Sequence, residues 1–218
     1  AGVIFVPRIG VAGQEKPWRL KESLGLPYWF SINGEHRVGY ETVNRQFRAK
    51  SSGSDQVLLF RTLLEADLYL SDEFKMKMEL LDARQSKADD GSQINNTMVN
   101  TLELLEGNIV WSSNGLFQAG SKSLLRGGRL TMDIVNRRFV ARNRFRNVIQ
   151  AFTGIDWNWT SKDKTQIRTI VTLPVNREPI SKSELLKNEV SFDKEKTDQI
   201  FWGMFFGIPN MLWGDTWE

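Results

Sequence analysis

The chain contains no cysteine and a single histidine, His36, among its 218 residues. The absence of cysteine excludes a disulfide framework and a thiol nucleophile, and one histidine cannot form a multi-histidine metal site. We therefore expect no metal and no cofactor. His36 falls on the apolar side of an alternating segment, which favours packing over general-base catalysis.

Long hydrophobic runs are also missing. The longest, at 200–208, has nine residues, whereas a membrane-spanning helix needs about 20. The start of the chain lacks a basic segment before its apolar residues, so the sequence predicts no secretory signal and a mature, trimmed or cytosolic chain. Strands of a membrane barrel need only about 9–11 residues and are not excluded.

Aromatic residues are abundant for so polar a sequence. Eight Trp and thirteen Phe occur in a chain with a mean hydropathy of -0.37 and 25% charged residues. Prolines and glycines interrupt residues 1–27, which we interpret as a lead-in segment. We interpret residues 28–218 as one β domain. Several tryptophans lie at expected strand ends, as in the aromatic girdles of outer-membrane barrels.

Apolar and polar residues alternate with a period of two in most of the chain, which predicts strands. About eight are expected, at 28–41, 56–70, 74–84, 100–111, 115–122, 149–160, 164–174 and 199–208. Their apolar side is predicted to face lipid at Phe60, Leu64, Leu68, Met76, Met78, Ile155, Trp157, Ile167 and Val171. A parity change at Leu80-Leu81 indicates a bulge that returns Asp82 and Arg84 to the polar side.

Short and long connections alternate along this series of strands. The expected short turns are 71–73, 112–114 and 161–163, and the expected long loops are 42–55, 84–99, 123–148 and 175–198. Outer-membrane barrels sort their connections in this way, with short turns at the periplasmic end and long loops outside. The pattern predicts an all-β, transmembrane, antiparallel up-and-down β-barrel of the porin type, with short turns and long loops at opposite ends.

A basic segment at 137–146 carries five arginines and no acid. Burying unpaired guanidinium groups is costly, so these residues must face water or an anion. A solvated loop, a nucleic-acid-binding patch and the lining of a polar channel all satisfy that requirement. The apolar strand faces elsewhere argue against a nucleic acid partner.

Several segments, taken in order, resemble the bacterial alginate-export outer-membrane proteins over about residues 28–208. They are Gly53-Ser54-Asp55-Gln56, Glu79 with Asp82-Ala83-Arg84, Phe117-Gln118-Ala119-Gly120-Ser121, Arg137-Arg138-Phe139-Val140, Arg146-Asn147 and Phe152-Thr153-Gly154. The family's Gly-Arg-Gln appears here as Gly120-Ser121-Lys122. The resemblance implies an arginine-lined barrel in the bacterial outer membrane, of about 16–18 strands, of which this chain would form part.

We therefore expect a non-enzymatic channel that passes anionic solutes or an alginate-like polyuronate by passive diffusion. The residues expected to line the pore and bind anions are Arg37, Arg61, Arg84, Arg138, Arg142, Arg144, Arg146 and Arg168, with Glu65, Asp67, Glu79 and Asp82 balancing their charge. The 123–148 loop is expected to fold toward the lumen. Lipid and periplasmic export proteins are the other expected partners; a soluble β-barrel or sandwich that binds anionic glycans is the alternative.

Overall fold

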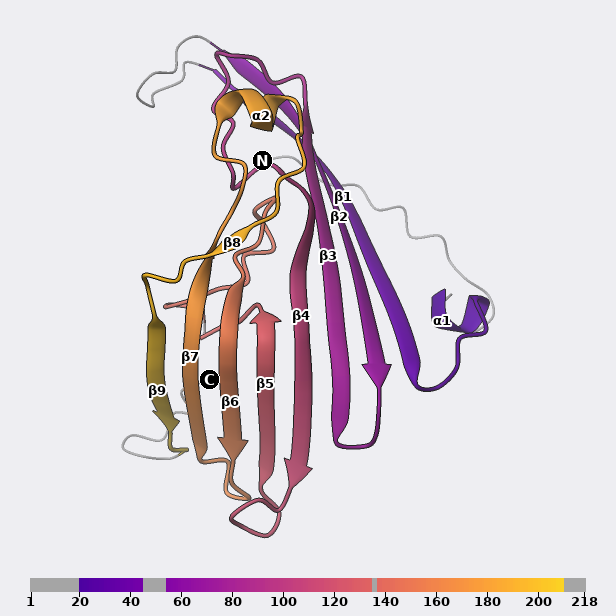
Figure 1. The fold of residues 1–218 in the computed structure, drawn as a ribbon, viewed down its shortest axis with the longest axis vertical. Helices are drawn as coiled ribbons and strands as arrows, with labels where there is room; N and C mark the ends of the chain where they lie inside the picture. Colours follow the sequence, from indigo (N-terminus) through magenta and orange to yellow (C-terminus); the bar gives the residue numbers. More distant parts are fainter. Residues whose placement is uncertain (1–19, 45–53, 135–136, 210–218) are drawn as a thin grey trace, which may run out of the picture.

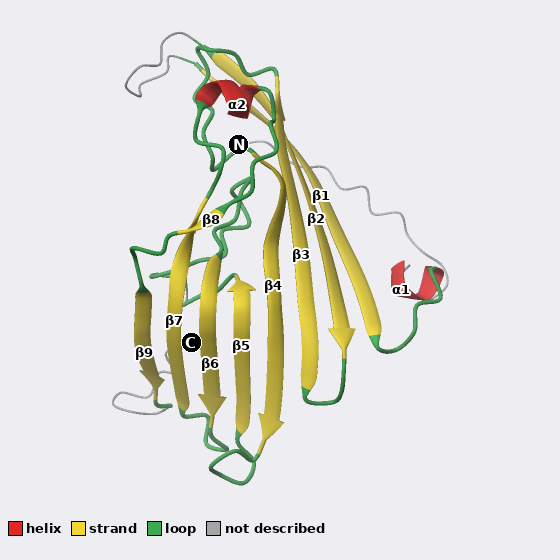
Figure 2. Cartoon of the chain, viewed as in Figure 1, coloured by secondary structure: helices red, strands yellow, loops and turns green. Residues whose placement is uncertain are grey.

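The computed structural model describes residues 20–44, 54–134 and 137–209, which form one antiparallel sheet and two short helices (Figure 2). No helix in the described ranges is long and apolar enough to span a membrane. The elements are α1 Leu20–Ser23, β1 Phe30–Val43, β2 Asp55–Tyr69, β3 Phe74–Ser86, β4 Asn100–Asn114, β5 Lys122–Leu130, β6 Phe152–Thr160, β7 Gln166–Asn176, α2 Lys182–Leu186, β8 Lys194–Glu195 and β9 Phe201–Gly207.

Each strand from β1 to β7 pairs with the next one along the chain, and β8 and β9 both pair with β7. All pairings between these named strands are antiparallel. The all-β, up-and-down architecture predicted from the sequence is confirmed. The described sheet is open, with β1 at one edge and β9 at the other (Figure 1).

The connections separate by length, as the alternation predicts. The longer ones, which include α2 and β8, gather at one end of the sheet, and the short turns close the other end (Figure 1). The predicted lead-in at 1–27 lies largely outside the described residues, apart from α1 and the few residues that follow it.

The strand predicted at 115–122 is wrong. Residues 115–121 form the turn between β4 and β5, where Gly115, Phe117 and Gly120 have positive φ angles of 84°, 65° and 82°, and three such residues within six positions do not fit a regular strand. The next strand, β5, begins at Lys122 and covers the first part of the loop predicted at 123–148. The true connection between β5 and β6 is residues 131–151, which we call the strap.

One side of the sheet, the apolar face, exposes large hydrophobic side chains. Leu64 is paired with Leu80, Met78 with Ala66 and Ile155 with Val171, and antiparallel partners point to the same side. Leu64, Met76, Met78, Ile155 and Val171 are 41–54% exposed, and Trp202 is 74% exposed on β9. So much exposed apolar surface is expected where the solvent is lipid.

Tryptophans cluster at the short-turn end of this apolar face. Trp111 and Trp157 flank Leu125 across β4, β5 and β6. Their indole nitrogens donate to Glu73 at 3.3 Å and to Ser123 at 2.8 Å, respectively. An apolar ring with a satisfied N–H suits the boundary between hydrocarbon and water.

The opposite side, the polar face, is covered by the strap and has a mixed core. Val148, Ile149 and Ala151 of the strap pack with buried Leu63 and Leu81 of the sheet. A second cluster joins Leu185 of α2 to Val57 and Leu59 of β2. These contacts fix the long connections against the polar face, so that ionic groups lie between packed layers.

Two glycines allow β5 and β6 to pass close to their neighbours. Gly128 and Gly154 are paired and have φ angles of +124° and +156°. A Cβ atom on Gly128 would lie 2.4 Å from the carbonyl oxygen of Gly107, and one on Gly154 would lie 2.2 Å from that of Val171. Only glycine fits such a backbone without displacing the adjacent strand.

Candidate functional site on the polar face

Three glutamates lie side by side across the centre of the polar face. Glu65 of β2 pairs with Glu79 of β3, which in turn pairs with Glu106 of β4. Glu79 and Glu106 are 3% and 2% exposed. Like charges in direct cross-strand pairs repel one another, so this row requires cations between its members.

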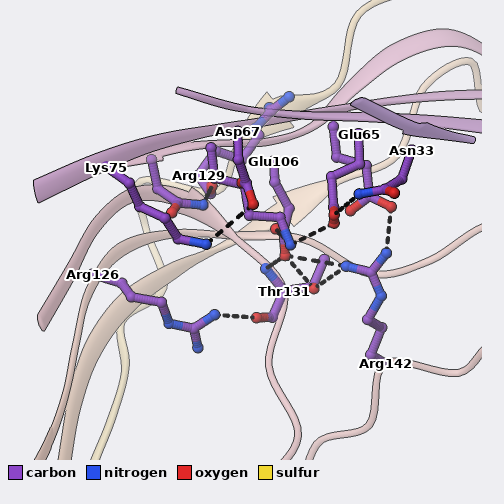
Figure 3. Close-up of polar contacts among 12 residues, drawn as sticks. Asn33, Glu65, Asp67, Lys75, Glu106, Arg126, Arg129, Thr131 and Arg142 are labelled. Atoms are coloured by element: carbon purple, nitrogen blue, oxygen red, sulfur yellow. Dashed lines mark hydrogen bonds and ion pairs between the residues drawn. The ribbon is translucent and has the colours of Figure 1, made fainter. Parts of the chain in front are cut away.

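Lys77 and Arg142 supply those cations from two directions. The Lys77 ammonium lies 2.8 Å from Glu65 and 3.0 Å from Glu106. Arg142, on the strap, donates to Glu79 at 2.5 Å and to Glu106 at 3.2 Å. Arg142 also donates to the Thr131 hydroxyl at 2.7 Å, which in turn contacts Glu106 (Figure 3). The strap is thereby bonded to the glutamate row.

Arg142 keeps its charge in this setting. Burial lowers the pKa of its guanidinium, but the hydrogen bond and the negative charge of Glu79, together with the charge of Glu106, outweigh burial and raise that pKa above its ordinary value. A permanently charged group that bridges two buried carboxylates is a strong, geometrically fixed contact.

A second ionic cluster surrounds Asp156 on β6. Arg168 of β7 donates to its two carboxylate oxygens at 2.8 and 3.0 Å. Arg126 of β5 donates to the same carboxylate from the other side, through Nε at 3.1 Å, and to the carbonyl oxygen of Thr131 at 3.2 Å. Asp156 is 3% exposed, so two guanidinium groups share one buried carboxylate.

Arg37 and Arg61 hold the backbone of the strap. Arg37 donates to the carbonyl oxygens of Arg144 at 2.8 Å and Phe145 at 2.9 Å. Arg61 donates to the carbonyls of Arg144 and Arg146, both at 2.8 Å, and forms an ion pair with Glu35. The strap therefore lies across the polar face, where Arg37 and Arg61 contact its carbonyl groups and not its arginine side chains.

A cavity of about 560 Å³ lies between the strap and the polar face of the sheet, and we call it the wall cavity. Its charged lining consists of Glu35, Glu65, Lys77, Glu79, Glu106, Arg126, Asp133, Arg142, Arg144, Asp156 and Arg168. Six of these side chains are acidic and five are basic. The cavity is thus densely charged but nearly balanced, and it is large enough for a ligand of several rings.

Most of the residues predicted for the site lie on this side of the sheet. Arg37, Arg61, Arg168, Glu65, Asp67 and Glu79 project from the polar face, and Arg142 reaches it from the strap. Arg138, Arg144 and Arg146 are exposed on the strap. The structure describes no hydrogen bond or ion pair for these three guanidinium groups, although Arg146 lies 5.9 Å above the Phe145 ring.

Asp82 and Arg84 lie on the apolar face, and their predicted place on the polar face is wrong. Arg84 pairs with Phe60 and Asp82 with Thr62, and the two charged residues bond to each other at 2.9 Å. The bulge predicted at Leu80-Leu81 is absent from β3, which pairs with β2 without interruption. The irregularity lies in β4, where the pairing with β3 shifts on either side of Leu80-Leu81.

Several charged and polar groups of the candidate site were not predicted from the sequence. Lys77, Glu106, Arg126, Thr131 and Asp156 were not predicted as site residues. Alternation places Lys77 on the polar side of its strand. The irregularity in β4 interrupts the alternation there, so the side of Glu106 could not be predicted. Arg126 and Thr131 were assigned to a loop because the glycines and arginines of β5 do not resemble a strand.

Comparison with known proteins agrees with this architecture. The model of the alginate export family matches residues 28–213. No curated protein and no solved structure matches the chain. Because the family match includes every strand from β1 to β9, the chain belongs to the alginate export family, a transport family of outer-membrane channels for polysaccharide.

Proposed function

We propose that the polar face forms part of the wall of a conduit through which a polyuronate passes by passive diffusion. The strap would form a constriction in that conduit. The observation that carries the proposal is the position of the strap, which crosses the polar face and borders the charged wall cavity. The exposed apolar surface on the other side of the same strands fits lipid.

The balanced charges favour passage over tight binding. Every basic group of the wall cavity except Arg144 already contacts a protein carboxylate. A uronate carboxylate that enters would replace Glu79 or Asp156 as the partner of a guanidinium group. Because one ion pair is lost for each one formed, little free energy would be gained at each step. Weak, repeated contacts of this kind let a polymer enter and leave.

The exposed arginines of the strap give the conduit its preference for anions. Arg138, Arg144 and Arg146 have no carboxylate partner among the described residues, so their charge is available to solutes. Guanidinium groups pair with carboxylates in a forked geometry. Positive groups at a constriction favour anions electrostatically.

The test is the ion selectivity of the full-length channel in planar bilayers. Replacing Arg138, Arg144 and Arg146 with serine should shift the reversal potential in a salt gradient toward cations. The same variant should reduce block of the current by oligouronates, most strongly at low ionic strength.

Arg84→Ser is the matched control, because Arg84 lies on the apolar face. It should leave the reversal potential and the block unchanged. Wild-type selectivity in the triple serine variant would contradict the proposal that the strap arginines face the permeating solute.

A further inference from the structure

A second cavity, which we call the mouth cavity, lies at the long-loop end of the sheet. Its volume is about 560 Å³. It is lined by Glu41, Val43, Asp55, Val57, Leu59, Gln93, Asn95, Thr97, Met98, Phe145, Arg146 and Asn147. These residues come from the upper ends of β1 and β2, from the connection between β3 and β4, and from the end of the strap.

Part of this lining is occupied by internal hydrogen bonds. Asn147 donates to the carbonyl oxygens of Phe60 at 3.0 Å and Met98 at 2.7 Å, and it accepts from Arg37 at 3.2 Å. Asn95 accepts from the backbone and the hydroxyl of Thr97, at 2.9 and 2.6 Å. These residues build the shape of the cavity and leave other groups to meet a ligand.

The polar groups left over are carboxylate oxygens, the buried amide nitrogen of Gln93, which has no hydrogen-bond partner among the described residues, and the guanidinium of Arg146. Asp55 uses Oδ1 to accept from Gln56 N at 2.8 Å and Ser92 Oγ at 2.7 Å. Its Oδ2 atom has no partner within the described ranges. The exposed carboxylate of Glu41 makes no hydrogen bond or ion pair among the described residues, although its charge acts on the guanidinium of Arg37. Carboxylate oxygens accept hydrogen bonds from hydroxyl groups.

Phe145 supplies an exposed aromatic ring beside these acceptors. The ring is 75% exposed, although its backbone is held in place by Arg37, which donates to the Phe145 carbonyl oxygen at 2.9 Å. Arg61 fixes the next residue through the carbonyl oxygen of Arg146. The backbone that carries the ring is therefore fixed, which lowers part of the entropic cost of binding. The apolar wall of Val57 and Leu59 lies in the same cavity.

The charge of the mouth cavity disfavours a polyanion. Two carboxylates, of Glu41 and Asp55, line it against one guanidinium, of Arg146, and that guanidinium lies over the Phe145 ring. A flat apolar platform with hydroxyl acceptors and no excess positive charge matches a sugar ring that carries hydroxyl groups and no charge. We propose that the mouth cavity is a binding site for a neutral saccharide, distinct from the wall cavity.

The experiment is a binding titration of the full-length protein in a detergent without a sugar head group. The probes are neutral linear hexasaccharides of glucose and mannose, and a hexauronate of the same length. A neutral hexasaccharide should bind saturably, with an affinity that does not change between low and high salt. Phe145→Ala should weaken this binding about tenfold or more, and Glu41→Gln should weaken it to a smaller extent.

Phe139→Ala is the matched control. Phe139 lies on the same strap and is 72% exposed, but its ring packs 6.3 Å from that of Phe205, and it does not line the mouth cavity. This variant should bind as the wild type does. Equal binding by the two alanine variants, no binding of either neutral hexasaccharide, or tighter, salt-dependent binding of the hexauronate that Phe145→Ala removes would overturn the assignment. Such a failure leaves the selectivity test of the strap arginines unaffected.

Discussion

Arg142 of the strap donates to Glu79 of β3 at 2.5 Å and so joins residues 63 positions apart. The contact is buried on both sides, with side-chain exposures of 15% and 3%. Removing one member of a buried pair leaves the other charge without a partner. Arg142→Met should therefore lower the free energy of unfolding by about 3 kcal/mol, as measured by urea denaturation in lipid vesicles.

Arg138→Met is the control for this prediction, because Arg138 is exposed and its guanidinium has no partner among the described residues; its stability should stay close to wild type. Adding Glu79→Gln to Arg142→Met should restore part of the loss, since the unpaired carboxylate is then neutral. Additive losses in the double variant would show that the two side chains do not interact.

Gly154 gives a prediction about the backbone. An alanine Cβ at this position would lie 2.2 Å from the carbonyl oxygen of Val171, and a φ of +156° is unfavourable for a residue with a side chain. Gly154→Ala should cost on the order of 1–3 kcal/mol and reduce the folded, heat-modifiable band on gels. Gly127→Ala is the control, because an alanine Cβ at that position would meet no atom within 4 Å beyond its chain neighbours.

Asp193 gives a prediction about pH. It lies in the connection after β7, outside the long strands, and accepts hydrogen bonds from Asn100 at 2.9 and 3.0 Å and from Glu178 N at 2.8 Å. Burial raises the pKa of its carboxyl group to about 6, the Glu103 charge adds to the rise, and the hydrogen bonds from Glu178 and Asn100 and the charge of Arg129 oppose it.

The sign of the effect follows from proton binding. The folded protein keeps the Asp193 proton up to about pH 6, whereas the unfolded chain loses it near 3.8. The contribution of Asp193 to stability is thus complete below the lower value and is lost as the pH rises through the upper one. Asp193→Asn should flatten this part of the stability profile, measured by denaturation between those two values. An identical slope in wild type and variant would contradict the assignment.

The sequence alone predicted the two-faced strands, because alternation in β2, β3, β6 and β7 is a direct consequence of burying one side. It failed where local backbone conformation overrides side-chain pattern. Phe117 has a φ of 65° inside an apparently alternating segment, and the Gly127-Gly128 pair within β5 is typical of a loop. These features depend on contacts between strands, such as the approach of Gly128 to Gly107.

The site was predictable in residue type but not in pairing. A periodicity assigns Glu79 to a side of the sheet, but it does not reveal that Arg142 is the cation that reaches it. The side of Arg84 depended on which strand carries the bulge, and that is fixed by the register between β3 and β4. Long-range partners and bulges arise from the assembled sheet, which a pattern along one strand does not encode.

The apolar face gives the last prediction, and the absence of cysteine makes it accessible to labelling. Single cysteines at Met78 and Val171, which are 50% and 51% exposed on that face, should carry fluorophores that lipid-confined quenchers reach. A cysteine at Asp67, on the polar face of β2, should be protected from the same quenchers. Met78→Lys should cost about 2–4 kcal/mol if this residue lies at the centre of the bilayer. Ser86→Lys, on the same face of β3, should have little effect, because Ser86 is the last residue of that strand and a charge near the end of a membrane strand costs little. Stronger quenching at Asp67 than at Met78 would reverse the assignment of the two faces, and with it the side of the sheet on which the proposed conduit lies.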